Sequence, residues 1–371
     1  MNEITSATLA PTVAAGAFLL AFIFGIVAQR SNFCTMGAIS DIVNIGDWTR
    51  MRMWMMAIAV AMLGANALHL AGLIDLAKSI YLAPRVTWLS GIVGGLCFGF
   101  GMTLASGCGS KTLLRIGTGN LKSLVVFIVL GISAYMTLKG VFGVWRTAAL
   151  DPVALNLAGT QDLPTLLARL GGLDRRWAQI GITLMLATGL FAFAIKSVEF
   201  RTADNLASSA VIGLVIAGGW YVSGRMGYLA EDPSTLQEAF AATNSGRMES
   251  FSFVAPSAYT LELLMLWSDK SRIVSFGIAA TLGVIGGAFA WALATRSFRL
   301  EGFRDAEDTA NHLVGAVLMG FGGVTGLGCT IGQGLSGVST LALGSFITLA
   351  AIIAGSVAAF RYQIWRLEKF G

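Results

Sequence analysis

Charged residues are scarce in this chain. Of 371 residues, 20 are acidic and 25 are basic, so 12% are charged, against about 25% in a soluble domain. Hydrophobic residues make up 55% of the chain and the mean hydropathy is +0.73. A soluble surface needs more charge, so this composition excludes a cytosolic enzyme, a nucleic-acid-binding protein and a disordered chain.

Metal-ligating residue types are also few, with four Cys and two His. These numbers are too small for a disulfide scaffold or for most metal clusters. No phosphate-binding glycine loop of the nucleotide-binding type occurs either. We therefore expect no cofactor, no bound metal and no enzymatic activity.

Long uncharged runs predict helices that cross a membrane. A bilayer core of ~30 Å needs ~20 helical residues. Seven runs each hold about one span and the run 309–360 holds two, and none alternates as a transmembrane barrel strand would. The seven single-span runs are 4–29, 53–74, 86–110, 123–138, 177–195, 205–224 and 273–295. The sequence thus predicts an all-α, polytopic membrane protein with about nine spanning helices in a single transmembrane domain over 1–371.

Loop charge predicts the orientation. Basic residues collect in short loops, as in Arg50–Arg52 and Arg296–Arg304, which we expect in the cytoplasm. The longer polar stretches 146–176 and 225–252 then become external loops. The first apolar run lacks a basic residue before it and ends in Gln29-Arg30, so we expect a span there and no cleaved signal.

A gap-free internal repeat ends in cysteine. GGLCFGFGMTLASGC (94–108) and GAVLMGFGGVTGLGC (315–329) both fit G-x4-G-F-G-x5-G-C. A weaker similarity aligns Gly25 with Gly213 and places Val222 opposite Cys34. About five spans separate the strong copies, so the two halves, 11–145 and 178–360, would be inverted repeats. Such repeats are typical of transporters with interrupted helices near the midplane.

The repeated glycines allow two interpretations. Small residues let helices pack closely, which accounts for Gly91, Gly94, Gly95 and Gly99. Close packing gives no reason for each copy to end in Gly-Cys. We therefore expect helix breaks at Gly107-Cys108 and at Gly328-Cys329, with short re-entrant helices restarting near Ser110 and Gln333.

Three cysteines are candidate site residues. Cys108 and Cys329 lie at the two breaks, and Cys34 lies in a polar interruption after Gln29. Cys97 lies within an apolar run and corresponds to Leu318, so we interpret it as an ordinary small apolar residue.

The neighbours of these cysteines suit an anion. Helix N-termini at the breaks present free N–H groups and partial positive charge. Arg30 and Lys111 add positive charge, and thiols match a soft sulfur-bearing anion. The predicted substrate-binding residues are Cys34, Cys108, Cys329, Arg30, Lys111, Gly107, Gly328 and Gln333.

Three motifs carry a resemblance to a known family. The segments QRSNFCTMGAISD, GFGMTLASGCGSKTLLRIGTGNLKSL and GFGGVTGLGCTIGQGLSG resemble the YeeE/YedE family of membrane sulfur-compound transporters. The resemblance implies an hourglass-shaped helical protein that takes up thiosulfate across the bacterial inner membrane. It also implies that Cys34, Cys108 and Cys329 pass the anion inward without a lasting covalent bond, and that a small cytoplasmic sulfur-carrier protein is a partner. This chain departs from the family in having Cys97 and a long 225–252 loop, and some relatives are assigned to selenium or other sulfur species.

Other functions stay open at this stage. The methionines at 51, 53, 55, 56 and 62 could serve a Cu(I) path, although methionine is more often filler at a membrane interface. A membrane thiol-redox protein would be expected to carry a close cysteine pair, and no Cys-x-x-Cys occurs. A structural subunit would need no helix breaks, and His69 and His312 lack a patterned second ligand.

Overall fold

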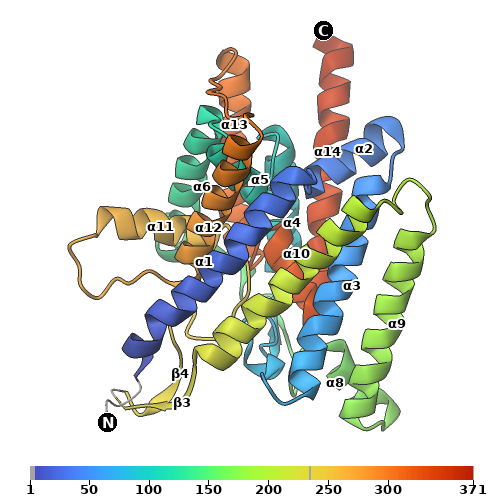
Figure 1. Ribbon diagram of the computed structural model, residues 1–371, viewed down its shortest axis with the longest axis vertical. Helices are drawn as coiled ribbons and strands as arrows, with labels where there is room; N and C mark the ends of the chain where they lie inside the picture. The colour runs from blue at the N-terminus through green and yellow to red at the C-terminus, as the bar shows by residue number, and fades with distance from the viewer. Residues whose placement is uncertain (1–4, 234, 371) are drawn as a thin grey trace.

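The computed structural model describes residues 5–233 and 235–370. The chain forms a bundle of helices (Figure 1) with two small two-stranded sheets. The helices are α1 (Ser6–Arg30), α2 (Thr35–Ile45), α3 (Thr49–Leu70), η1 (Leu76–Lys78), α4 (Trp88–Leu104), α5 (Gly109–Gly117), α6 (Leu121–Lys139), α7 (Val141–Trp145), η2 (Arg146–Leu150), α8 (Leu163–Gly171), α9 (Arg175–Ile195), α10 (Ala203–Tyr221), η3 (Val222–Met226), α11 (Ala255–Met265), α12 (Phe276–Ala294), α13 (Ala306–Thr325), η4 (Gly332–Gly337) and α14 (Leu343–Phe370). The strands are β1 (Arg85–Val86), β2 (Leu155–Asn156), β3 (Tyr228–Asp232) and β4 (Gln237–Phe240).

Eight helical segments in the described residues are long and apolar enough to cross a membrane. They correspond to the seven single-span runs and to the second half of the run 309–360. The ninth predicted span corresponds to α13, whose first turn carries Glu307 and Asp308. The predicted all-α polytopic fold is confirmed.

The repeated glycines lie where the two halves of the chain pack together, and their contacts are related by a pseudo-two-fold symmetry. A Cβ on Gly94 would lie 2.8 Å from the carbonyl oxygen of Gly322, and one on Gly315 would lie 2.6 Å from that of Gly101. Gly94 corresponds to Gly315 in the repeat, and Gly101 corresponds to Gly322. The same contact is therefore made twice, once from each half. The close-packing interpretation of these upstream glycines is confirmed.

Other helix pairs follow the same symmetry. Helix α4 packs against α14, and its repeat counterpart α13 packs against α6. Helix α1 packs against α12, and α10 packs against α3. Gly25 on α1 and Gly213 on α10 lie at these two interfaces, against α12 and α3 respectively. The pairings support an inverted repeat, and the boundaries 11–145 and 178–360 remain predictions.

Two faces are defined by the loops. The basic face carries turns 31–34, 46–50, 118–122, 196–204 and 295–308, joined by the ion pairs Arg30–Asp204 and Lys122–Asp308, both 2.6 Å. The loop face carries 71–87, 140–174 and 227–254. These segments are joined by the Lys78–Glu238 ion pair and by a hydrogen bond from the Ile80 N–H to the Met248 carbonyl.

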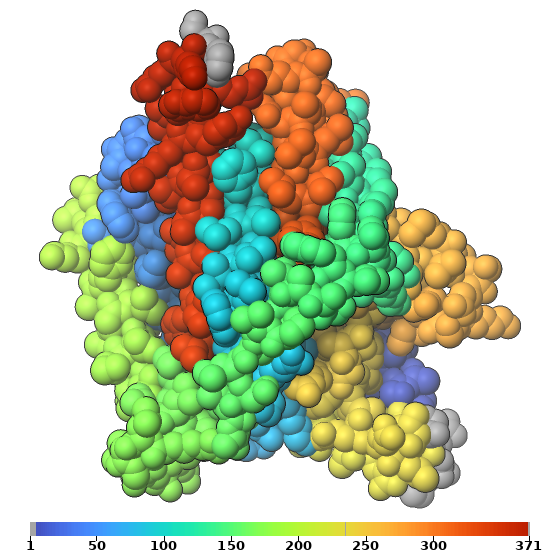
Figure 2. Space-filling model, turned by 180° about the vertical axis from the view of Figure 1, so that it is seen from behind, coloured from blue at the N-terminus to red at the C-terminus, as the bar shows by residue number. Residues whose placement is uncertain are grey.

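Figure 1 shows α8, β3 and β4 at one end of the molecule and the end of α14 at the other. In Figure 2 the green segment between α6 and α9 crosses the outside of α4. The two long loops predicted to be external thus share one face.

Candidate functional site

Three helix breaks share one backbone geometry. Asn32, Ser106 and Leu327 have left-handed φ angles of 51°, 55° and 57°. In each break the next residue donates its N–H to a carbonyl five positions back, as in the Gly107 N–H to the Met102 carbonyl at 2.8 Å. This arrangement ends a helix and turns the chain sharply. The cysteine follows two residues after the left-handed residue in all three cases.

Each cysteine then begins a short helix. Cys34 is the N-cap of α2 and Cys108 is the N-cap of α5, while residues 330–339 after Cys329 are helical and include η4. The Cys34 Sγ accepts the Gly37 N–H at 3.4 Å, and the Cys329 Sγ accepts the Gly332 N–H at 3.4 Å. The predicted interruption of the helices is confirmed, with restarts directly after the cysteines. The partial positive charge of three helix N-termini therefore falls on three thiols.

The three thiols converge in the interior. Cys34, Cys108 and Cys329 are buried, with relative exposures of 4%, 0% and 0%. The Cys34 and Cys108 thiols are direct neighbours, and the Cys108 thiol also meets the Ser110 Oγ at 3.3 Å and the Thr330 side chain next to Cys329. The side chains thus form one continuous series from Cys34 to Cys329.

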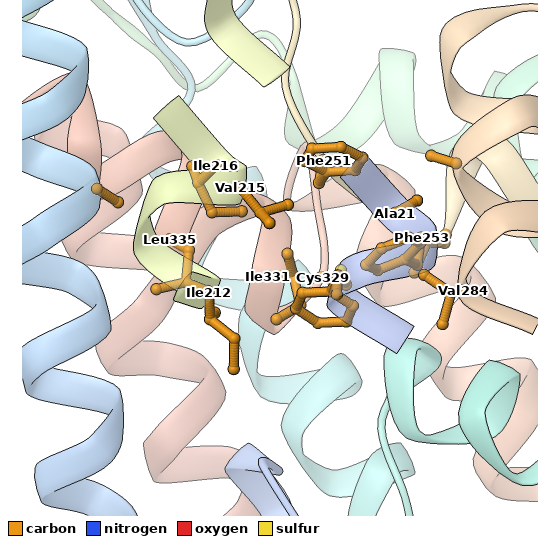
Figure 3. Packing of buried hydrophobic residues seen from close by; sticks show 14 of the residues in the cluster. Ala21, Ile212, Val215, Ile216, Phe251, Phe253, Val284, Cys329, Ile331 and Leu335 are labelled. Carbon is orange, nitrogen blue, oxygen red and sulfur yellow. The ribbon is translucent and has the colours of Figure 1, made fainter. Parts of the chain in front are cut away.

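Apolar side chains surround Cys329. Figure 3 shows the thiol among residues of α10, α1, α12 and the extended segment 251–253. The Phe253 ring lies tilted against the rings of Phe24 and Phe251, with ring centroids 5.8 and 6.5 Å apart. An ion at this point meets thiols, backbone donors and hydroxyls inside an apolar ring, which disfavours a strongly hydrated ion.

A cavity of about 390 Å³ opens from Cys34 toward the basic face. Its charged lining residues are Arg50, Lys111, Arg115, Arg299 and Glu301. Arg50 pairs with Asp41 at 2.6 Å, and Arg115 donates to the Ser106 carbonyl at 2.8 Å. Lys111 makes no ion pair within the described residues. This basic-face cavity holds an excess of positive charge beside two thiols.

A second cavity of about 190 Å³ reaches from Asn244 and Ser245 on the loop face to Gly328, the residue before Cys329. Gly328 lines its inner end, and so does Ser252, whose Oγ lies 4.0 Å from the Cys329 Sγ. The thiol series therefore lies between two cavities on opposite faces, and the hourglass shape implied by the family resemblance stays a prediction.

The other predicted site residues fall in different places. Gly107 lies against the Lys111 side chain. Gln333 is buried, and its Nε2 donates to the Gly326 carbonyl at 2.5 Å, while its Oε1 has no hydrogen-bond partner among the described residues. Arg30 is not brought to the thiols: it is half-exposed, pairs with Asp204 on the surface and lies over Trp291.

Sequence reasoning missed two hydroxyls and a cation at the site. Ser252 and Tyr81 come from loop segments, and a Cβ on Gly332 would lie 2.7 Å from the Ser252 Oγ and 3.3 Å from the Tyr81 hydroxyl. The buried Tyr81 hydroxyl has no hydrogen-bond partner in the part of the chain that the structure describes. Arg50 lies over Gly37 at the start of α2. No spacing in the sequence connects these residues to the cysteines.

The residues assigned structural roles lie away from the path. Cys97 is a half-buried free thiol on α4. Met53 and Met62 are packed in the core, and His69 and His312 bond to backbone groups at 3.2 and 2.7 Å.

Comparisons with known proteins agree with this geometry. Residues 30–358 match the model of a family described as "Sulphur transport". The chain is 27% identical over 339 residues to the thiosulfate transporter TsuA of Escherichia coli (strain K12), covering 90% of each protein. It is also 27% identical over 347 residues to the thiosulfate transporter TsuA of Spirochaeta thermophila, covering 91% of this chain and 95% of that one. With helix breaks, central thiols and a family match over most of its length, the chain belongs to the YeeE/YedE sulphur transport family of multi-pass membrane proteins, which are transporters and not enzymes.

Proposed function

We propose that this chain takes up thiosulfate, or a closely related sulfur anion, across the bacterial inner membrane. The anion passes from the loop-face cavity to Cys329, then to Cys108 and Cys34, and leaves through the basic-face cavity. The observation that carries this proposal is the series of three buried thiols, each at a helix N-terminus, between two cavities on opposite faces.

The chemistry of the path favours a soft anion. Thiols are weak hydrogen-bond donors and polarisable acceptors, which match the terminal sulfur of thiosulfate. Backbone N–H groups and hydroxyls such as those of Ser252 and Ser110 suit its oxygens. No acidic residue lies within 86–110 or 309–360, so the breaks at Cys108 and Cys329 lack the carboxylates that a cation path would need.

The charge distribution supports inward transport. Short loops rich in Lys and Arg remain in the cytoplasm, so the basic face is taken as cytoplasmic. An anion leaving Cys34 then meets Lys111, Arg115 and Arg50 in the basic-face cavity. The small cytoplasmic sulfur-carrier protein implied by the family resemblance would collect the anion at the mouth of this cavity.

One observation favours a second candidate, a thiol-redox protein. The Cys34 and Cys108 thiols are neighbours, as a redox pair would be. Counting free thiols before and after transport separates the two functions. A relay without a lasting covalent bond leaves all four cysteines free, whereas redox turnover changes the number of free thiols.

The direct test of the proposed function is uptake of radiolabelled thiosulfate by vesicles that contain the purified protein. Cells that depend on thiosulfate as their sole sulfur source provide a second readout. Transport of Cu(I), or growth without the protein at the same rate, would contradict the proposal. Selenium compounds or sulfide transported in place of thiosulfate would keep the path and change the substrate.

A further inference from the structure

One carboxyl group lines the loop-face cavity. Glu249 and Arg146 are the two charged side chains among the lining residues, and the cavity ends at Gly328 and Ser252 beside Cys329. A divalent anion that enters through this cavity therefore passes Glu249 on its way to Cys329. The loop-face cavity lacks the excess of positive charge found in the basic-face cavity, because its lining holds one basic and one acidic side chain.

The carboxyl of Glu249 forms no ion pair with any basic residue in 5–233 or 235–370. Its Oε2 accepts the Ser245 hydroxyl at 3.1 Å, and no ion pair among the described residues involves it. Arg146 on η2 pairs with Asp151 at 3.3 Å, and Lys78 on η1 pairs with Glu238. Arg225, near the end of η3, lines a different cavity. The basic residues on the neighbouring elements thus either pair with other acidic residues or line another cavity.

Two phenols lie near Glu249. Tyr259 on α11 and Tyr81 on the 71–87 loop both lie within range of its charge, and Tyr81 also lies within range of Cys329. The phenols are neutral and do not offset a carboxylate. On its own loop Glu249 meets Ser245 and Asn244, while its backbone carbonyl accepts the Ser223 hydroxyl. Apart from Arg146, which pairs with Asp151, the other residues that line the cavity around Glu249 are neutral.

We propose that Glu249 is a specificity-determining residue of the loop-face cavity, which admits a divalent sulfur anion when the carboxyl is protonated and repels it when the carboxyl is ionised. The neutral carboxyl also offers an O–H donor to the oxygens of the anion, whereas the carboxylate offers acceptors alone. This inference rests on the proposed function and adds a proton requirement to its first step.

Burial raises the pKa of the Glu249 carboxyl to about 7, more than the hydrogen bond from Ser245 lowers it. Below that pH the group is neutral and the cavity accepts the anion. Above it the group is charged and the cavity rejects the anion. Thiosulfate stays divalent throughout this range, so its own ionisation does not contribute.

The experiment measures initial uptake of labelled thiosulfate by vesicles containing the full chain, at equal pH on both sides and at low thiosulfate concentration. Wild-type uptake should fall at least about fivefold between pH 6 and pH 8.5, with a midpoint near 7. Glu249→Gln should take up thiosulfate at a rate that changes less than about twofold over the same range. Glu238→Gln is the control, because it makes the same substitution on the loop face but outside this cavity. It should keep the wild-type pH profile of uptake.

A second variant tests the same carboxyl without removing it. Ser245→Ala deletes a hydrogen bond that favours the ionised form, so the midpoint should move to higher pH. A flat wild-type profile, an unchanged Ser245→Ala midpoint, or a Glu249→Gln profile that still falls would each overturn the inference. Failure of the proposed function gives a different result, because wild-type vesicles would then take up no thiosulfate at any pH.

Discussion

Cys34 and Cys329, which are 295 residues apart in the chain, have the same local geometry at the starts of two short helices. Each Sγ accepts a backbone N–H from the residue three positions on, at 3.4 Å in both cases. Each also follows a left-handed residue by two positions. The geometry that presents a thiol at a helix N-terminus therefore occurs at both ends of the proposed path, and Cys108 continues the series between them.

The first prediction concerns these thiols. Cys108→Ala and Cys329→Ala should each abolish thiosulfate uptake in vesicles, and Cys34→Ala should impair it at least about tenfold, because each removes one step of the path. Thermal unfolding in detergent should stay close to wild type, since alanine fits a buried thiol position with a small loss of contact. Normal uptake by Cys108→Ala would defeat the thiol path.

Cys97→Ser is the matched control. Cys97 lies on α4 away from the break, and its repeat counterpart is Leu318. A serine hydroxyl in a helix can bond to a carbonyl one turn back, so uptake should remain near wild type. Loss of uptake in well-folded Cys97→Ser protein would show that the repeat assigns the functional cysteines wrongly.

The second prediction concerns charge in the basic-face cavity. Lys111→Met should reduce uptake at low thiosulfate concentration by about tenfold or more, because a hydrogen bond to a charged group contributes roughly 1.5–3 kcal/mol. Lys122→Met is the control, because Lys122 pairs with Asp308 outside the cavity. Equal rates for both variants would remove Lys111 from the path.

The third prediction concerns orientation. A reporter inserted at Arg304, in a short loop of the basic face, should be cytoplasmic, and one at Asn244, on the loop face, should be external. Accessibility of each tag to a membrane-impermeant reagent in intact cells measures this. Reversed labelling would invert the proposed direction and leave the repeat unchanged.

The fourth prediction concerns the glycine contacts. Gly99→Ala on α4 places a Cβ 2.0 Å from the Ile352 carbonyl oxygen of α14, so the helices must separate. The expected loss is about 1–3 kcal/mol of folding free energy, seen as a lower midpoint in thermal unfolding. Gly189→Ala on α9 is the control, because a Cβ there meets nothing within 4 Å and alanine favours helix. A Gly99→Ala protein as stable as wild type would contradict the observed packing.

Sequence patterns predicted the helices and the repeat because both depend on local composition. Uncharged runs locate spans, and matched glycines locate the helices that approach most closely. The sequence also indicated Cys34, Cys108 and Cys329, although it did not show that all three begin a helix in the same way. The left-handed positions are occupied by Asn32, Ser106 and Leu327, three residue types without a common propensity.

Distance along the sequence did not predict which basic side chains lie beside the cysteines. Arg30 is four residues from Cys34 but lies at the end of α1 on the surface, where it meets Asp204. Arg50 is sixteen residues away, yet the turn between α2 and α3 brings it over Gly37. Ser252 and Tyr81 reach Cys329 from loops whose course depends on tertiary packing, so no local pattern could locate them.

Competition during uptake of labelled thiosulfate by reconstituted vesicles tests the central claim most directly. The account predicts that excess sulfate, sulfite and Cu(I) each compete poorly, because none combines a soft terminal sulfur with a divalent anion of this shape. Sulfide and selenium analogues should compete in part. Sulfate competing as well as thiosulfate, or accumulation of Cu(I) in the vesicles, would contradict a path built from three thiols for a soft sulfur anion.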